Sequence, residues 1–184
     1  MLRSALILFL GLSSFYPSAE EGGRLLHLSG SRFSLEVMEP EGWELATRAA
    51  LQIADFILYP EGTDWRRADV VIYVRFVDHE EYESCNEFIE SSREQFRAQC
   101  PLGDGEIATE SLQRVSGFLV EEFRCAGIRE EMIAVTDVPD RFVVFSLTAQ
   151  TGHSIDHSIP VLKEILRSFK WYEMAADQPP SHHE

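Results

Sequence analysis

Three residues in the C-terminal part of the chain are of types that bind metal ions. His153, Asp156 and His157 lie within five positions of one another in the segment TGHSIDHSIP. Two imidazoles and a carboxylate are ligands that zinc, iron and nickel accept. The segment also fits a helix start, because Asp156 and Ser158 are good N-cap residues and Pro160 is tolerated in a first turn. We favour the helix start and keep a small metal-binding protein or metal-dependent hydrolase that uses this loop as the alternative.

The rest of the sequence lacks the short motifs of common catalytic sites. It has no G-x-S-x-G, no S-x-x-K and no phosphate-binding glycine loop. His79 and Glu83 have the spacing of H-E-x-x-H, but a glutamate stands where the second histidine is needed. We therefore expect a protein that is not an enzyme, with no catalytic residues and no cofactor.

Charge excludes one large class of partners. The 184 residues include 31 acidic and 16 basic side chains, which gives a net charge of −15. Phosphate backbones repel so acidic a chain, so we expect no nucleic-acid binding. The length and a hydrophobic content of 45% suit one folded domain.

The N-terminal residues have the layout of a signal peptide. A positive start with Arg3 precedes an apolar run of about a dozen residues, which is too short for a comfortable membrane span. Residues 1–19 are thus predicted to be a signal peptide, although Pro17 is unfavourable for cleavage and a retained anchor stays an alternative. We expect a periplasmic or secreted protein with no stable membrane span after cleavage. Residues 20–29 are predicted to be a flexible lead-in, 30–173 a single domain and 174–184 a disordered tail.

An exported protein with three cysteines has one disulfide and a spare thiol, or no disulfide. Cys85 falls on the apolar face of a predicted helix, which suggests a buried, unpaired side chain. Cys100 at a helix end and Cys125 in a strand are the plausible pair.

Apolar periodicity predicts strands and two helices. Residues 43–54 are ambiguous, because their composition favours a helix and their position between strands favours a ribbon. The other predicted elements are strands over 32–38, 55–59, 68–78, 106–115, 118–125, 128–137 and 142–150, and helices over 79–99 and 158–170. The class predicted is α+β, an antiparallel sheet with helices packed on it.

Two segments resemble the Mog1/PsbP-like family, which includes the DcrB-type bacterial envelope proteins. They are RFSLEVMEPEGWEL, and FVVFSLTAQ followed by VLKEILRSFKW with its Ser168-Phe169 pair. The resemblance implies an α/β/α sandwich and favours the ribbon over residues 43–54. It also implies a non-enzymatic accessory protein that binds a larger assembly, but no partner-binding motif can be matched onto this chain.

Trp43 and Trp65 both lie beside predicted turns, and aromatic side chains anchor interfaces. They are the predicted partner contacts. We expect an exported, non-catalytic accessory or binding module with a protein partner in the cell envelope or extracellular space. A small-ligand carrier with an apolar cavity is a further alternative.

Overall fold

The structure is a computed structural model that describes residues 24–29, 33–46, 54–100, 108–125 and 127–173. Its strands are β1 Leu25–Ser29, β2 Phe33–Met38, β3 Trp43–Ala46, β4 Phe56–Pro60, β5 Val70–Asp78, β6 Ala108–Val115, β7 Phe118–Cys125, β8 Arg129–Val138, β9 Arg141–Ala149 and β10 Lys170–Glu173. Its helices are α1 Cys85–Gln99, the short 3₁₀ helix η2 Asp156–Ser158 and α2 Ile159–Ser168. The predicted signal peptide and C-terminal tail lie outside the described residues.

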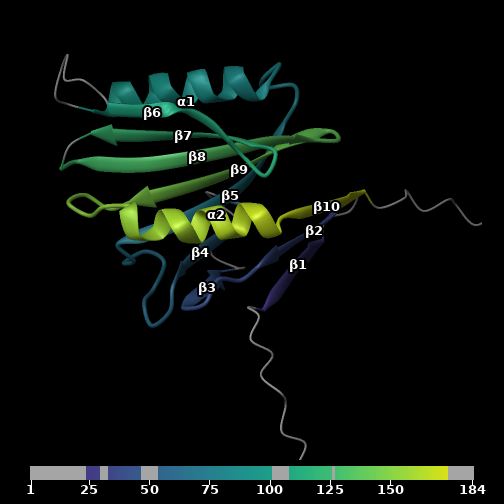
Figure 1. The fold of residues 1–184 in the computed structure, drawn as a ribbon, viewed down its shortest axis with the longest axis horizontal. Coiled ribbons are helices and arrows are strands. Elements are labelled where there is room, and N and C mark those ends of the chain that lie inside the picture. The colour runs from purple at the N-terminus through teal and green to yellow at the C-terminus, as the bar shows by residue number, and fades with distance from the viewer. Residues whose placement is uncertain (1–23, 30–32, 47–53, 101–107, 126, 174–184) are drawn as a thin grey trace, which may run out of the picture.

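The main sheet has seven strands in the order β3-β4-β5-β9-β8-β7-β6, and every neighbouring pair is antiparallel (Figure 1). A smaller antiparallel sheet has the order β1-β2-β10. The predicted α+β class, with an antiparallel sheet flanked by helices, is confirmed.

The two helices cover opposite faces of the main sheet because its central strands are apolar on both faces. Ile72 of β5 and Leu147 of β9 share a buried cluster with Leu162 of α2. Val77 and Val144, which point the other way along the same strands, share a second cluster with helix α1. We call these surfaces the α2 face and the α1 face. The small sheet packs on the α2 face, so that the sandwich has three layers.

Helix α1 begins later than its acidic N-terminal flank suggested. The predicted start at residue 79 is wrong, because residues 79–84 precede the helix. Ser84 is the N-cap, and its hydroxyl accepts a hydrogen bond from the Glu87 amide at 3.2 Å. The Glu87 carboxylate in turn accepts one from the Glu83 amide at 2.7 Å. This reciprocal pair satisfies free amides at the helix start and fixes where the helix begins.

Parts of the small sheet were not predicted from the sequence. Residues 25–29, expected to be a flexible lead-in, form β1, and residues 170–173 form β10 instead of extending the last helix. Both segments pair with β2. The hydrogen bonds of that pairing stabilise strands that are too short to be stable alone. Residues 43–46 are a strand paired with β4, as the ribbon predicts, while 47–53 lie outside the described residues.

The Ser168-Phe169 pair joins α2 to both sheets. The Ser168 hydroxyl accepts a hydrogen bond from the Met38 amide at 3.0 Å and donates one to the Ile165 carbonyl at 2.8 Å. The Phe169 ring packs edge-on against Phe118 and Phe145, at centroid distances of 5.2 and 6.0 Å. The pair thus ends the helix and turns the chain into β10.

Candidate functional site

The histidine loop precedes α2, and its side chains are engaged separately. The Nε2 atom of His153 lies 3.4 Å from the Asp69 carboxylate, whereas the Asp156 carboxylate accepts from Arg124 and His157 is exposed. No three His, Cys, Asp or Glu residues in the described part of the chain are grouped to hold a metal ion. The metal site considered for His153, Asp156 and His157 is not formed in this arrangement, since the Asp156 carboxylate is paired with Arg124.

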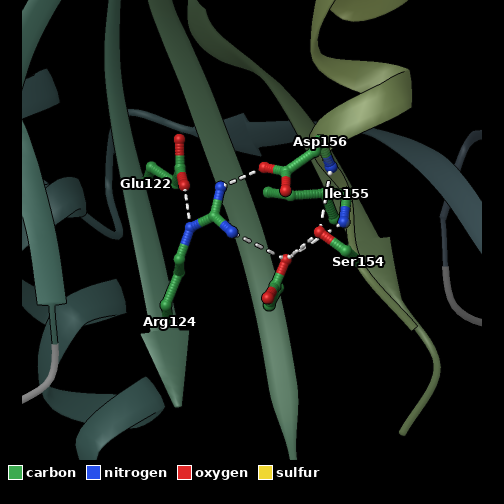
Figure 2. A network of polar contacts seen from close by, with 6 residues as sticks. Glu122, Arg124, Ser154, Ile155 and Asp156 are labelled. Atoms are coloured by element: carbon green, nitrogen blue, oxygen red, sulfur yellow. Dashed lines mark hydrogen bonds and ion pairs between the residues drawn. The ribbon is translucent and has the colours of Figure 1, made fainter. Parts of the chain in front are cut away.

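Arg124 of β7 binds carboxylates from three elements (Figure 2). Its Nε atom donates to Glu122 of the same strand, and Nη1 donates to Glu130 of β8 at 3.2 Å. Its Nη2 atom donates to Asp156 of η2. The guanidinium lowers the pKa of the Asp156 carboxyl, and the Asp156 hydrogen bond raises the pKa of Arg124.

The same cluster supplies the helix cap that we expected from Asp156 and Ser158. Neither residue makes a capping hydrogen bond through its side chain. Instead the Glu130 carboxylate accepts from the Ile155 amide at 3.1 Å and from the Ser154 hydroxyl at 2.7 Å (Figure 2). The helix start was predicted, but the amides there have other partners: the Ile155 amide donates to Glu130 of a distant strand, and the Asp156 amide donates to the Ser154 hydroxyl at 3.2 Å. We therefore interpret the cluster as a structural contact that joins the sheet to the start of the helix.

A groove lies on the α1 face, beside the strands that α1 leaves uncovered. Helix α1 packs over β7 and β8. Away from α1, the same face carries a separate buried apolar cluster around Ile57 and Val71. Between the two clusters lies a hollow of about 330 Å³, and hollows of about 290 and 420 Å³ adjoin it through shared residues such as Tyr73 and Gln99. We call the three hollows together the α1 groove.

The floor of the α1 groove is made by strand register. Tyr73 of β5 pairs with Ser146 of β9, which pairs with Ile133 of β8, so their side chains stand in one row. Thr148 and Glu131 form the next row on the same face. Polar side chains thus line a floor within strands that are otherwise apolar.

One wall of the groove is a face of α1. The residues Ser92, Gln95, Phe96 and Gln99 recur at helical spacing and line the main hollow. Cys100, immediately after this face, is bonded to Cys125 at the end of β7, with a Cα–Cα distance of 6.0 Å. The disulfide suggested by the sequence therefore fastens the end of the wall to the sheet. Cys85 is free and half-buried, and burial raises the pKa of its thiol.

The arginines of the groove differ in their partners. Arg129 donates to Glu131 at 2.8 Å and to Gln99, and its guanidinium lies 5.5 Å from the centre of the Phe96 ring. Arg75 is exposed on β5, and its side chain makes no hydrogen bond or ion pair with the described residues. The Arg75 guanidinium is thus not hydrogen-bonded, although it lies near enough to Glu131 to lower the pKa of that carboxyl.

Burial shifts the pKa of two floor residues. It raises the pKa of the Glu131 carboxyl, although Arg129 opposes this effect. Burial and the nearby Glu131 raise the pKa of Tyr73, so its hydroxyl stays protonated and able to donate at neutral pH. The floor thus presents hydroxyl donors.

The two tryptophans predicted as partner contacts lie in different environments. Trp65 lines the end of the α1 groove, and the Arg66 guanidinium lies 4.6 Å from its ring centre. Trp43 is only 7% exposed and belongs to the core on the α2 face. Trp65 is therefore accessible to a partner, whereas Trp43 is buried and is not.

The sequence did not predict Tyr73, Arg75 and Ser146 as site residues. The usable signal was a polar side chain inside an apolar strand, as in VVIYVRFVD and FVVFSLTA. Only the sheet order places the two strands side by side and brings these side chains together on the α1 face.

No helix in the described ranges is long and apolar enough to cross a membrane.

No protein-family model matches the sequence, and no curated protein matches it significantly. Among solved structures, the chain is similar to the solution structure of cyanobacterial PsbP (CyanoP) from Synechocystis sp. PCC 6803. The two are 15% identical with a TM-score of 0.49, and the likeness covers 88% of this chain and 99% of that one.

Proposed function

We propose that this protein is an exported, non-catalytic accessory module that binds a partner protein through the α1 groove. The observation that carries the proposal is the kind of side chain that gathers there. Trp65, Tyr73 and Phe96 are accompanied by Arg66, Arg75 and Arg129. Tryptophan, tyrosine and arginine are the residues that most often dominate the binding energy of protein interfaces.

The form of the groove favours an extended protein segment as the ligand. Three adjoining hollows share lining residues and continue from the α1 wall to Trp65. An extended segment fills such a path with successive side chains, whereas a compact small molecule needs one enclosed pocket.

Export is supported by two independent features. The N-terminal pattern of a positive start and an apolar run is typical of a signal peptide. The Cys100–Cys125 disulfide suits an oxidising compartment, where such bonds persist. The resemblance of the sequence to Mog1/PsbP-like proteins supports the accessory, non-catalytic part of the proposal.

Site-specific photo-crosslinking tests the proposal. The photoreactive residue p-benzoylphenylalanine is placed at Gln95, which lines the groove, or at Ala98, which is exposed on α1 outside the lining. Each variant is irradiated in the envelope and culture-fluid fractions of the source organism. We expect one crosslinked protein with the label at 95 and none with the label at 98. Equal crosslinking at both positions, or none at 95, would overturn the proposal.

A pair of blocking variants supplies the matched control. Gln95→Trp places a bulky ring in the groove, and Ala98→Trp places the same ring elsewhere on the helix. We expect pull-down of the crosslinked partner to fail with Gln95→Trp and to persist with Ala98→Trp.

A further inference from the structure

The α1 groove is cationic in a protein that is otherwise strongly acidic. The whole chain carries a net charge of −15. The described residues that line the groove include Arg66, Arg75 and Arg129 but a single carboxylate, that of Glu131. An acidic ligand is therefore repelled by most of the surface and attracted to this part of it. Such a local reversal of charge orients a partner and favours its binding at one place.

Arg75 lines the main hollow and makes no hydrogen bond or ion pair with the described residues, although its charge lowers the pKa of Glu131. Arg129 is held by Glu131 and Gln99, and Arg66 lies over the Trp65 ring. The Arg75 guanidinium has no hydrogen-bonded or ion-paired partner in the described part of the chain, although the groove that it lines is open. Its planar fork of N–H donors matches the two oxygens of a carboxylate.

A second polar side chain lines the hollow beside Arg75. Ser146 is only 5% exposed, and its hydroxyl makes no hydrogen bond with any described residue. The hydroxyl oxygen is not sealed from solvent, so a ligand that enters the groove can reach it. Ser146 pairs across the strands with Tyr73, and Arg75 is the next residue along β5 on the same face. The three donors are thus neighbours.

We infer that the α1 groove binds an acidic, extended segment of the partner protein. A carboxylate of the segment pairs with Arg75, and the hydroxyls of Ser146 and Tyr73 donate to that carboxylate or to the segment's backbone carbonyls. This inference rests on the proposed function, because it names the chemistry of the partner that the groove takes.

Peptide binding to the purified, disulfide-bonded protein tests the inference. The probe is a fluorescein-labelled octapeptide of alternating glutamate and alanine, and its control has glutamine in place of glutamate. We expect the glutamate peptide to bind about tenfold more tightly in low salt. The difference should shrink in high salt, because mobile ions screen exposed charges. Equal binding of the two peptides would overturn the inference.

Four variants assign the effect to the groove. Arg75→Gln should weaken binding of the glutamate peptide about tenfold, and Ser146→Ala should weaken it about fivefold. Glu131→Gln should tighten binding, since it removes the carboxylate that lines the groove. The control is Arg167→Gln, which removes an exposed cation from α2 on the opposite side of the sheet and should leave binding unchanged. An Arg75→Gln variant that binds like the unmodified protein would contradict the assignment.

Two further experiments distinguish this inference from a small-anion site and from the proposed function. If free succinate or inorganic phosphate displaces the peptide as well as unlabelled peptide does, the groove is a small-anion site and the acidic-segment inference is wrong. If Gln95→Trp abolishes pull-down of the natural partner while Arg75→Gln leaves the pull-down unchanged, the proposed function stands and the inference falls. If Gln95→Trp has no effect on the partner, the proposed function itself falls.

Discussion

Arg93 of α1 and Glu121 of β7 form a bidentate ion pair between the helix and the sheet. The Nε and Nη2 atoms of Arg93 donate to the two carboxylate oxygens of Glu121, at 2.9 and 2.8 Å. The Glu121 side chain is 3% exposed and that of Arg93 is 28% exposed. A carboxylate this deeply buried depends on its partner, because desolvation of an unpaired charge is costly.

Removal of the arginine alone should therefore be strongly destabilising. We expect Arg93→Met to lower the free energy of unfolding by about 3 kcal/mol, measured by urea denaturation. The double variant Arg93→Met/Glu121→Leu should recover most of that loss, because no buried charge is left unpaired. A single variant as stable as the unmodified protein would show that Glu121 does not need the pair.

Reduction of the Cys100–Cys125 disulfide should destabilise the fold and loosen the wall of the groove. The bond closes a loop with a sequence separation of 25, for which loop entropy predicts a loss of about 3 kcal/mol on reduction. The measurement is urea unfolding with and without a thiol reductant in a Cys85→Ala background, which leaves no free thiol to exchange. Hydrogen exchange at the last turn of α1 should also accelerate on reduction. Unchanged exchange there would mean that packing alone holds the wall.

The two tryptophans should respond in opposite ways to substitution. Trp43→Ala should lower the free energy of unfolding by about 3 to 5 kcal/mol, because it leaves a cavity in the core on the α2 face. Trp65→Ala should cost about 1 kcal/mol or less, yet weaken recovery of the partner. Urea denaturation and pull-down of the crosslinked partner measure the two effects. If a folded Trp43→Ala variant fails to recover the partner and Trp65→Ala still recovers it, the interface does not include Trp65.

The Asp156–Arg124 pair should give a pH-dependent contribution to stability. Arg124 holds the pKa of the Asp156 carboxyl below its ordinary value of 3.8. A pKa lowered by folding stabilises the protein above the ordinary value, and this contribution is lost as the pH falls through the lowered pKa. Asp156→Asn should thus reduce the melting temperature at neutral pH, and its difference from the unmodified protein should fade in acid.

The matched control is Asp78→Asn, since the Asp78 carboxylate makes no hydrogen bond or ion pair with the described residues. We expect that variant to melt like the unmodified protein at neutral pH. An Asp156→Asn difference that persists in acid would show that the loss is not electrostatic.

Much of the fold could be predicted from local pattern, because apolar periodicity reports which side of an element is buried. The hairpin at Ser116-Gly117 illustrates this point. Both residues have positive φ, 50° and 91°, as a two-residue turn between twisted strands requires. The late start of α1 could not be read in this way, since acidic residues are favourable both before a helix and in its first turn, and the Ser84 cap decides between them.

The histidine loop shows the limit of local reasoning about sites. Ser158 and Asp156 are residues that commonly cap helices, yet the Ser154 hydroxyl and the Glu130 carboxylate bind the amides at this helix start. The Asp156 carboxylate binds Arg124 instead. The partners in the Glu130 and Arg124 contacts are separated by 25 and 32 positions in the sequence, so no short segment of the chain contains both partners. The same holds for the α1 groove, whose floor joins β5 to β9.

By itself, the sequence determined the alternation of strands and helices, the acidic surface and the identity of the cysteines available for a disulfide. These follow from composition and from periods of two and 3.6 residues, which are properties of neighbouring positions. Only the three-dimensional structure shows which carboxylates pair with Arg93 and Arg124, which tryptophan is buried and which polar side chains line the α1 groove. Those outcomes depend on strand order and on which strands α1 covers, because pairing between distant segments sets the contacts and burial of each side chain.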